Sequence, residues 1–100
     1  MVEIELSVEK LSQILGDEYY VKILTATAST PKNALQLSEE HDIPLAVCYR
    51  KIKYLETEGL LVGIDNMIGE KGKKTKKYLS QLKGASITLQ DRRIMTKLWS

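Results

Sequence analysis

The chain has 100 residues, of which 43% are hydrophobic and 28% are charged, and its formal net charge at pH 7 is +2. This composition is typical of one small soluble globular domain. No internal repeat, low-complexity segment or linker divides the sequence, so we expect a single domain over residues 1–100.

The cellular compartment is predicted from three features of the chain. The single cysteine, Cys48, excludes an internal disulfide and is typical of a reducing compartment. The first residues are acidic and lack the basic start and apolar core of a signal peptide. No apolar stretch approaches the length that crosses a bilayer. We therefore expect a soluble cytoplasmic protein with no membrane partner.

Charge is distributed unevenly between the two halves of the chain. Residues 1–45 hold three lysines against eight acids, whereas residues 46–100 hold twelve Lys and Arg residues against five acids. Such an asymmetry lets one side of a protein attract phosphate while the other side repels it, although an ordinary solvated surface gives the same count.

The first third of the chain predicts a strand and two helices. Val2 to Leu6 alternates apolar and acidic residues, which indicates a short half-buried strand. Ser7 is placed to cap a helix over residues 7–15, with Gly16 as its stop, and Asp17 is placed to cap the next helix. Pro31 and the two hydroxyl residues before it end that second helix.

Residues 33–58 predict two short helices joined by a tight turn. Asn33 and Gln36 have the spacing of a capping box at the start of the third helix. Pro44 suits the first turn of the fourth helix, and Gly59 ends it. A helix pair of this size, followed by an extended basic segment, is the arrangement of a winged helix-turn-helix, so we predict an α+β fold of that type.

The fourth helix has two contrasting faces at 100° per residue. Cys48, Ile52 and Leu55 fall on one side and predict the face turned to the core. The other side is cationic and aromatic with a small residue near its start, and it carries Ala46, Tyr49, Arg50, Lys53 and Thr57, with Lys51 and Tyr54 at its flanks. A polar back is also ordinary for a surface helix. We interpret this side as a recognition surface, because arginine reaches guanine acceptors and tyrosine meets a phosphate or a thymine methyl.

Residues 60–82 predict a hairpin that is rich in lysine. Gly69 and Gly72 permit the positive φ values of a tight loop. Lysines can protect an exposed strand edge from aggregation. Five of them within seven residues, next to a basic helix face, favour phosphate contacts instead: Lys71, Lys73, Lys74, Lys76 and Lys77.

The C-terminal segment predicts a strand and a last helix. Ala85 to Leu89 is a strand candidate that we expect to pair with Val2 to Leu6, and Asp91 is placed to cap a helix over residues 91–100. Residues 7–15 and 91–100 carry more apolar surface than so small a core needs, which predicts a homodimer interface. Its candidate residues are Val8, Leu11, Leu15, Ile94, Met95, Leu98 and Trp99.

Several short segments of the sequence resemble those of a known family. They are the segment from Leu15 to Leu24, Leu37-Ser-Glu-Glu, Asp42-Ile-Pro44, Tyr49-Arg50-Lys-Ile52 and the segment from Leu55 to Leu61. Over residues 14 to 80 the chain resembles archaeal ArsR-like winged-helix regulators. The resemblance implies a dimeric transcription regulator with residues 46–53 in the major groove of double-stranded DNA and residues 71–77 along the minor groove or backbone. The DNA-binding set it implies is Lys32, Asn33, Ala46, Val47, Tyr49, Arg50, Lys53, Tyr54, Lys71, Lys73, Lys74, Lys76 and Lys77.

The sequence departs from the pattern of this family at three places. Ala46 and Val47 replace the small hydroxyl residues that such helices often carry, which leaves contact with a thymine methyl as the remaining readout there. His41 stands where the family commonly has an apolar residue, and we interpret it as a partly buried histidine rather than a pH switch. Cys48 lacks the second cysteine of metal-sensing members, so we expect a small core residue and no metal site.

No catalytic constellation, cofactor motif or phosphate-binding glycine loop is present in the sequence, so we expect neither an enzyme nor a bound cofactor. Two other kinds of partner stay open. A winged-helix fold also serves as a protein-interaction module or as a subunit of a transcription complex, and the basic hairpin is compatible with RNA.

Overall fold

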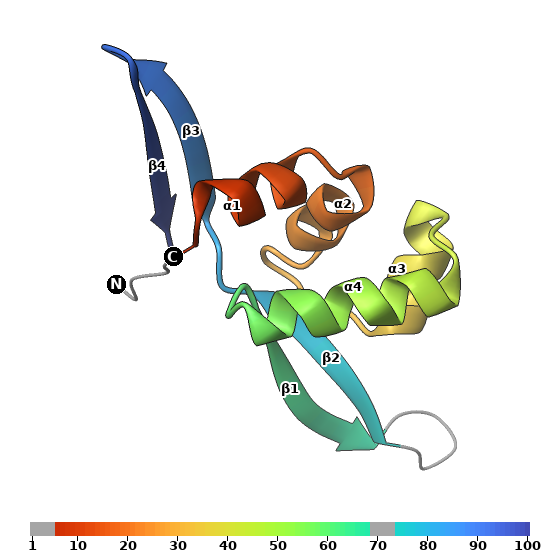
Figure 1. Ribbon diagram of the computed structural model, residues 1–100. Helices are drawn as coiled ribbons and strands as arrows, with labels where there is room; N and C mark the ends of the chain where they lie inside the picture. Colours follow the sequence, from red (N-terminus) through yellow and green to blue (C-terminus); the bar gives the residue numbers. More distant parts are fainter. Residues whose placement is uncertain (1–5, 69–73) are drawn as a thin grey trace.

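The computed structural model describes residues 6–68 and 74–100 and has an α+β architecture (Figure 1). Within these residues, four helices precede two antiparallel hairpins, each of which forms its own two-stranded sheet. The elements are α1 (Val8–Leu15), α2 (Glu18–Ala26), α3 (Ala34–His41), α4 (Leu45–Thr57), β1 (Leu61–Ile68), β2 (Lys74–Ser80), β3 (Gly84–Gln90) and β4 (Arg93–Trp99).

Side-chain caps fix the starts of the first three helices, as the sequence predicts. The Ser7 hydroxyl accepts a hydrogen bond from the backbone N–H of Lys10, and the Asp17 carboxylate accepts from two N–H groups in the first turn of α2. Asn33 and Gln36 form a complete capping box at α3, because each side chain accepts from the backbone N–H of the other. These caps satisfy donors that a helix start otherwise leaves unpaired.

The core lies between α2, α3 and α4 and extends to the start of β1. Its fully buried side chains include Ile23, Leu37, Ile52, Leu55 and Leu60. Leu60 follows Gly59, which has a φ of 79° and so adopts a left-handed conformation that glycine reaches without strain. This turn sends the chain directly from α4 into the β1–β2 hairpin.

The β1–β2 hairpin is fastened to the helical body along one edge. Lys32 and Tyr78 exchange two backbone hydrogen bonds of 3.1 and 2.8 Å, and the N–H of Ser80 donates to the carbonyl of Thr27. The connection between α2 and α3 therefore pairs with β2 along the edge that faces away from β1, near the C-terminal end of the strand. The ring of Tyr78 is buried in the core, so the base of the hairpin is held at two points.

The predicted C-terminal helix over residues 91–100 is wrong, because the segment forms strand β4. Asp91 and Arg92 have φ values of 51° and 65°, which are the two left-handed central positions of a tight hairpin turn. Seven consecutive residue pairs then join β3 to β4, from Gln90 opposite Arg93 to Gly84 opposite Trp99.

The strand predicted at Ala85 to Leu89 is confirmed as part of β3, which pairs with β4. Residues 2–5 of the strand predicted from Val2 to Leu6, and with them its predicted pairing with β3, lie outside the described residues.

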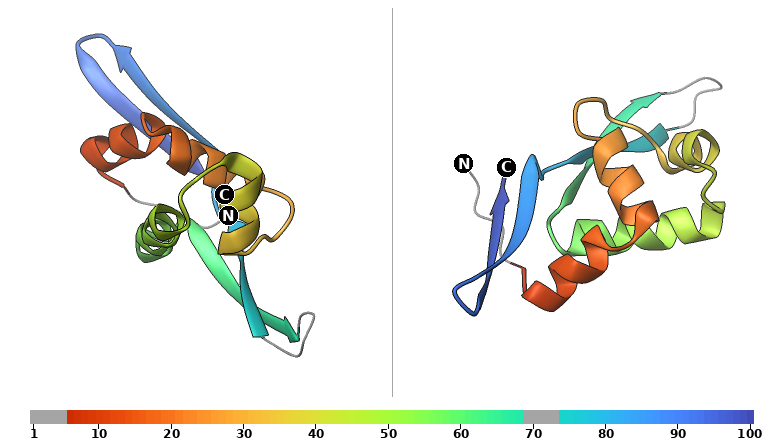
Figure 2. Two further views of the ribbon diagram at one scale, coloured as in Figure 1. Left: turned by 90° about the vertical axis from the view of Figure 1, so that its right-hand side faces the viewer. Right: turned by 90° about the horizontal axis from the view of Figure 1, so that it is seen from above.

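The two hairpins extend from opposite sides of the helical body in all three ribbon views (Figures 1 and 2). The molecule is correspondingly elongated, with principal extents of 57 × 29 × 19 Å. The β1–β2 hairpin leaves the body beside α4, and the β3–β4 hairpin runs past α1 (Figure 1). Each hairpin can therefore meet a different partner.

Candidate nucleic-acid interface

The turn between α3 and α4 is rigidly defined. Asp42 has φ 55° and ψ 46°, and the N–H of Ile43 donates to the Ser38 carbonyl at 3.0 Å. The Ser38 hydroxyl donates back to the Ile43 carbonyl at 2.5 Å, while the Ile43 side chain is buried. Pro44 is the residue just before α4, where the chain turns into the second helix of the pair. Reciprocal bonds of this kind at a helix end leave little freedom in the angle between the two helices.

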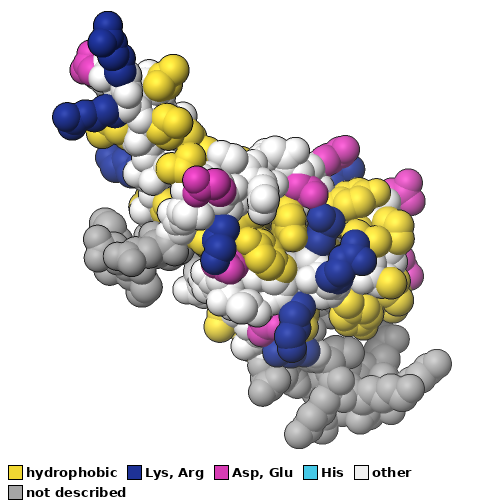
Figure 3. All heavy atoms as spheres, in the orientation of Figure 1, with side chains coloured by type: hydrophobic (Ala, Val, Ile, Leu, Met, Phe, Trp, Pro, Cys, Tyr) yellow, Lys and Arg dark blue, Asp and Glu magenta, His cyan; other side chains and the backbone are white. Residues whose placement is uncertain are grey.

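The two faces of α4 lie as the helical spacing predicts. Cys48, Ile52 and Leu55 are buried against the core. Ala46, Arg50 and Lys53 are exposed, and Tyr49 has 54% of its surface accessible. Basic side chains alternate with apolar ones over this part of the surface (Figure 3). The exposed face therefore combines charge, an aromatic ring and a small residue.

Lys51 and Tyr54 belong to a cluster between α4 and the start of α2, rather than to the exposed face. The Nζ atom of Lys51 lies 2.8 Å from the Asp17 carboxylate and 4.1 Å from the centre of the Tyr20 ring. The rings of Tyr20 and Tyr54 are 5.6 Å apart. The lysine side chain is only 14% exposed, so its charge is used inside the protein. Val47 is likewise half-buried against the core.

Asp17 serves two elements at once, as the cap of α2 and as the partner of Lys51. Partial burial alone raises the pKa of this carboxyl group, but the hydrogen bond from Lys51 and the backbone N–H groups of α2 outweigh it. The pKa of Asp17 is therefore lowered from its ordinary value of 3.8. The carboxylate stays charged at neutral pH and ties α4 to α2.

Lys32 and Asn33 already have partners within the chain. The Lys32 ammonium forms an ion pair with Glu40, and the Asn33 side chain is engaged in the capping box of α3. Both residues lie at the start of α3, and Lys32 also bridges to β2. They hold α3 against the β1–β2 hairpin, and only a rearranged Lys32 side chain would be free to meet a phosphate.

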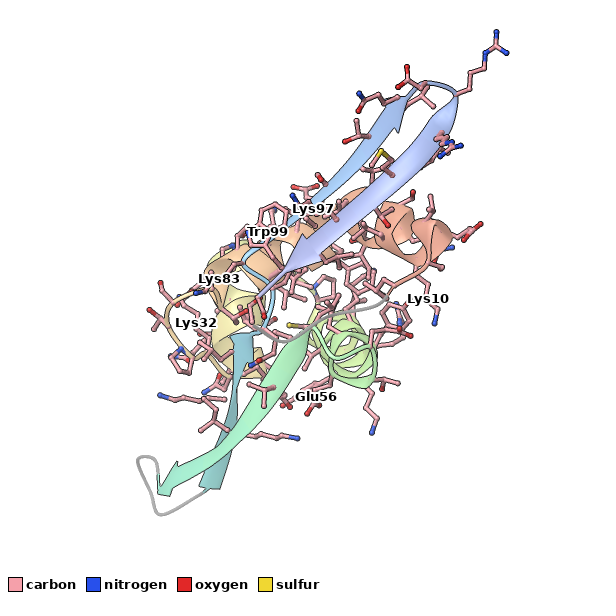
Figure 4. All side chains as sticks on the ribbon, turned by 90° about the vertical axis from the view of Figure 1, so that its left-hand side faces the viewer. Lys10, Lys32, Glu56, Lys83, Lys97 and Trp99 are labelled. Carbon is pink, nitrogen blue, oxygen red and sulfur yellow. The ribbon has the colours of Figure 1, made fainter. Side chains whose placement is uncertain are left out.

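The predicted lysines of the hairpin divide into three groups. Glu56 lies between α4 and the β1–β2 hairpin (Figure 4), and its carboxylate is 3.1 Å from the Nζ atom of Lys76. The same Nζ atom is 5.5 Å from the centre of the Tyr78 ring. Lys77 is half-buried, and Lys74 belongs to β2. Lys71 and Lys73 lie outside the described residues.

Cys48 occupies an unreactive position. The Cys48 thiol is fully buried, lies 3.6 Å from the Ala34 carbonyl, and has its pKa raised by burial. A buried thiol of raised pKa is a poor nucleophile. His41 is half-buried at the end of α3. Within residues 6–68 and 74–100, no three His, Cys, Asp or Glu side chains are grouped closely enough to hold a metal ion.

The candidate dimer residues are spread over several environments. Leu11 is fully buried inside its own chain, while Val8 and Leu98 are half-buried. The remaining candidates keep exposed surface: Leu15, Ile94, Met95 and Trp99.

Sequence reasoning missed the structural role of Lys51 and two exposed leucines. Asp17 and Lys51 are 34 residues apart, and no local pattern joins them. Leu35 is 51% exposed on α3 and Leu45 is 40% exposed at the start of α4. The signal available in the sequence was the position of each leucine away from the buried side of its helix.

No protein-family model matches the sequence, and no curated protein is significantly similar to it. None of the helices in the described part of the chain is long and apolar enough to span a membrane.

Proposed function

We propose that this chain is a sequence-specific, double-stranded DNA-binding regulator of transcription, of the winged helix-turn-helix and ArsR-like type. The observation that carries the proposal is the structure of α4: its exposed face holds Tyr49, Arg50 and Lys53, and its opposite face is buried. A helix of 13 residues is about 20 Å long, which is sufficient to lie in a major groove about 12 Å wide.

Each residue of the α4 face suits a different contact. Ala46 lets the helix backbone come close to the base edges, because its side chain is a single methyl group. Arg50 can donate two hydrogen bonds to guanine, and Tyr49 can contact a thymine methyl or a phosphate. Lys53, one turn further along, is suited to the DNA backbone. The acids Glu56 and Glu58 come at the end of α4, and ion pairs with Lys76 and Lys10 offset their charge.

The β1–β2 hairpin supplies the second contact in this proposal. It follows α4 after one turn and is held to the α2–α3 connection through Lys32 and Tyr78. A basic arm attached this firmly has a fixed direction relative to α4. Its lysines would contact phosphates, which adds affinity without sequence information.

The cluster around Lys51 holds α4 in place, and this supports the proposal that α4 is the recognition helix. The ion pair with Asp17 and the contact with Tyr20 join the middle of α4 to α2. A base contact requires a helix whose rotation about its own axis is fixed, because each residue turns the exposed face by 100°. Lys51 would thus act through position and not by touching DNA.

Titration of a labelled random duplex, followed by fluorescence anisotropy at several salt concentrations, tests the proposal. We expect binding that weakens steeply as salt rises, because bound lysines release counterions from the duplex. Absence of duplex binding at low salt would contradict the proposal.

A protein partner is the second candidate, and the exposed apolar residues Leu35 and Leu45 favour it. Apolar side chains at a surface are more typical of a protein interface than of a phosphate backbone. Under this alternative the chain is a winged-helix interaction module without specific DNA readout. The same titration separates the two candidates, since a protein-interaction module would show no salt-sensitive binding to the duplex.

A further inference from the structure

An open apolar groove lies where the segment between β2 and β3 passes α2. Its volume is about 180 Å³, and its walls come from the end of α1, from α2 with the residues just after it, and from the start of β3. Among the described residues, none that lines the groove belongs to α4 or to the β1–β2 hairpin, so the groove is separate from the surface proposed to meet DNA. The apolar part of the lining comprises Leu15, Val21, Leu24, Ala28, Leu82 and Ala85.

The wall that α2 contributes is one side of that helix. Val21, Leu24 and Thr25 are spaced by three or four residues, and Ala28 continues the same row just after the helix ends. The Thr25 hydroxyl donates to the Val21 carbonyl at 2.8 Å, so its donor is used within α2. Ala28 is exposed, and its single methyl group does not fill the groove. This wall therefore offers a ligand apolar surface without a free side-chain donor.

The opposite wall is held in place by hydrogen bonds. The N–H of Leu82 donates to the Ser80 hydroxyl at 3.1 Å, and that hydroxyl donates to the Leu82 carbonyl at 3.2 Å. The N–H of Lys83 donates to the Trp99 carbonyl at 2.8 Å. The indole ring of Trp99 packs on Gly84, where an added Cβ atom would overlap the ring. Because this wall is already ordered, a ligand would not have to order it on binding.

Lys83 gives the groove a positive charge. In the part of the chain that the structure describes, it is the only charged residue lining the groove, and it forms no ion pair there. Lys83 is exposed and lies beside Trp99 at the base of the β3–β4 hairpin (Figure 4). Glu18, at the start of α2, is already paired with Lys22 at 2.9 Å. The positive charge at the groove is therefore left for a ligand.

We propose that this groove binds a small organic carboxylate with an apolar body of about seven carbon atoms. A cavity of about 150 Å³ holds benzene, with its six carbons, and the groove is slightly larger. The apolar body would lie against α2 and the start of β3, and the carboxylate would pair with Lys83. One lysine balances a single negative charge, which favours a carboxylate over a doubly charged phosphate. The site is separate from α4, and its occupation does not depend on DNA binding.

Titration of the isotope-labelled full chain with octanoate, followed by NMR chemical shifts, tests the site. We expect saturable shifts centred on residues 21–28 and 82–85. Two probes separate the parts of the ligand. 1-Heptanol has the same seven-carbon chain without the charge and should bind about threefold to fivefold more weakly, which is the strength of an exposed ion pair. Acetate has the charge without the chain and should give no saturable shifts.

Two lysine and arginine variants test the role given to the charge. Lys83→Met should lower the affinity for octanoate to that for 1-heptanol and leave 1-heptanol binding unchanged. Arg93→Met is the matched control, because it removes the same charge opposite Gln90, six residues beyond Gly84 along β3 and about 20 Å away. It should bind octanoate as the wild type does. Equal octanoate binding by Lys83→Met and the wild type would overturn the pairing with Lys83.

Ala28→Leu tests the apolar part of the site. The larger side chain should fill the groove and reduce the binding of octanoate and 1-heptanol at least tenfold, while the circular dichroism spectrum stays that of the folded chain. Unchanged binding by this variant would overturn the placement of the ligand. Absence of saturable octanoate binding to the wild type, the result expected if a protein covers the groove, would overturn the proposal. None of these readouts involves DNA, so failure here and failure of the DNA-binding function are distinguishable.

Discussion

At the scale of single residues, Lys51 and Asp17 join two helices that are well separated in the sequence. Their ion pair spans α2 and α4 at 2.8 Å, and the same carboxylate caps α2. Replacing Lys51 leaves the cap intact, whereas replacing Asp17 changes both functions unless the cap is preserved. Asparagine preserves it, because its side-chain oxygen also accepts hydrogen bonds at a helix start.

The lowered pKa of Asp17 predicts an acid-dependent loss of stability. A carboxyl group whose pKa is lower in the folded state stabilises the fold above its ordinary value of 3.8, and this contribution is lost as pH falls through the folded pKa. In urea unfolding, the wild-type chain should therefore exceed Asp17→Asn in stability at pH 6, and the difference should shrink by pH 3. A difference that is the same at both pH values would contradict the role given to the ion pair. Asp17→Ala, which also removes the cap, should cost about 1 kcal/mol more at pH 6.

Cys48 should behave as a small core residue. Cys48→Ala removes one buried sulfur atom and is expected to lower the free energy of unfolding by about 1 kcal/mol. Sequence preference on DNA should not change, since the side chain is on the buried face of α4. Rapid reaction of the native thiol with a disulfide reagent, before any unfolding, would contradict its burial.

At the scale of elements, the sequence predicted what local chemistry decides. The starts of α1, α2 and α3 depend on Ser7, Asp17 and Asn33, each of which bonds to the backbone two or three residues away. The inward face of α4 followed from helical spacing alone. Contacts between distant segments, such as Lys51 with Asp17, leave no such local signal.

Strand β4 shows why the C-terminus was predicted wrongly. Ile94, Met95, Leu98 and Trp99 are spaced as in a helix, and Asp91 is an acceptable helix cap. The same residues in a strand put Ile94 and Leu98 on one face and Met95 and Trp99 on the other. Pairing with β3 decides between the two patterns. Only one tight turn separates β3 from β4 in the sequence.

The turn between β3 and β4 can be used to check this correction. Asp91 and Arg92 both have positive φ, which Asn-Gly adopts with less strain. Changing them to Asn and Gly should stabilise the hairpin by about 1 kcal/mol, seen as slower amide exchange in β3 and β4. In a helix capped at residue 91 the glycine would weaken the first turn, so faster exchange would contradict the strand.

At the scale of the whole molecule, we assign different roles to the two hairpins. The β1–β2 hairpin follows the proposed reading helix, and the β3–β4 hairpin extends from the other side of the body (Figure 1). This separation allows two copies to associate through one end while α4 stays exposed. In a dimer the two α4 helices would be expected about 34 Å apart, or a multiple of that turn, to read two half-sites.

The lysines of the β1–β2 hairpin should supply affinity without sequence preference. Changing Lys73, Lys74, Lys76 and Lys77 to alanine should weaken binding to all duplexes alike. The slope of log affinity against log salt should fall by about 0.9 for each lysine that meets a phosphate. Lys76 already pairs with Glu56, so it should contribute less than the others. Lys97→Ala, on the far hairpin, is the matched charge control, and an equal effect there would contradict a specific role for β1–β2.

The most direct test of the account is a selection of bound sequences from random duplexes, carried out in parallel with the wild-type chain and Arg50→Ala. The account predicts a defined motif for the wild type and loss of preference at one position per half-site for the variant, worth about 1–3 kcal/mol of discrimination. Binding to random DNA should be largely retained by Arg50→Ala. An unchanged motif would show that α4 does not read bases through Arg50, and absence of any motif for the wild type would contradict sequence-specific recognition altogether.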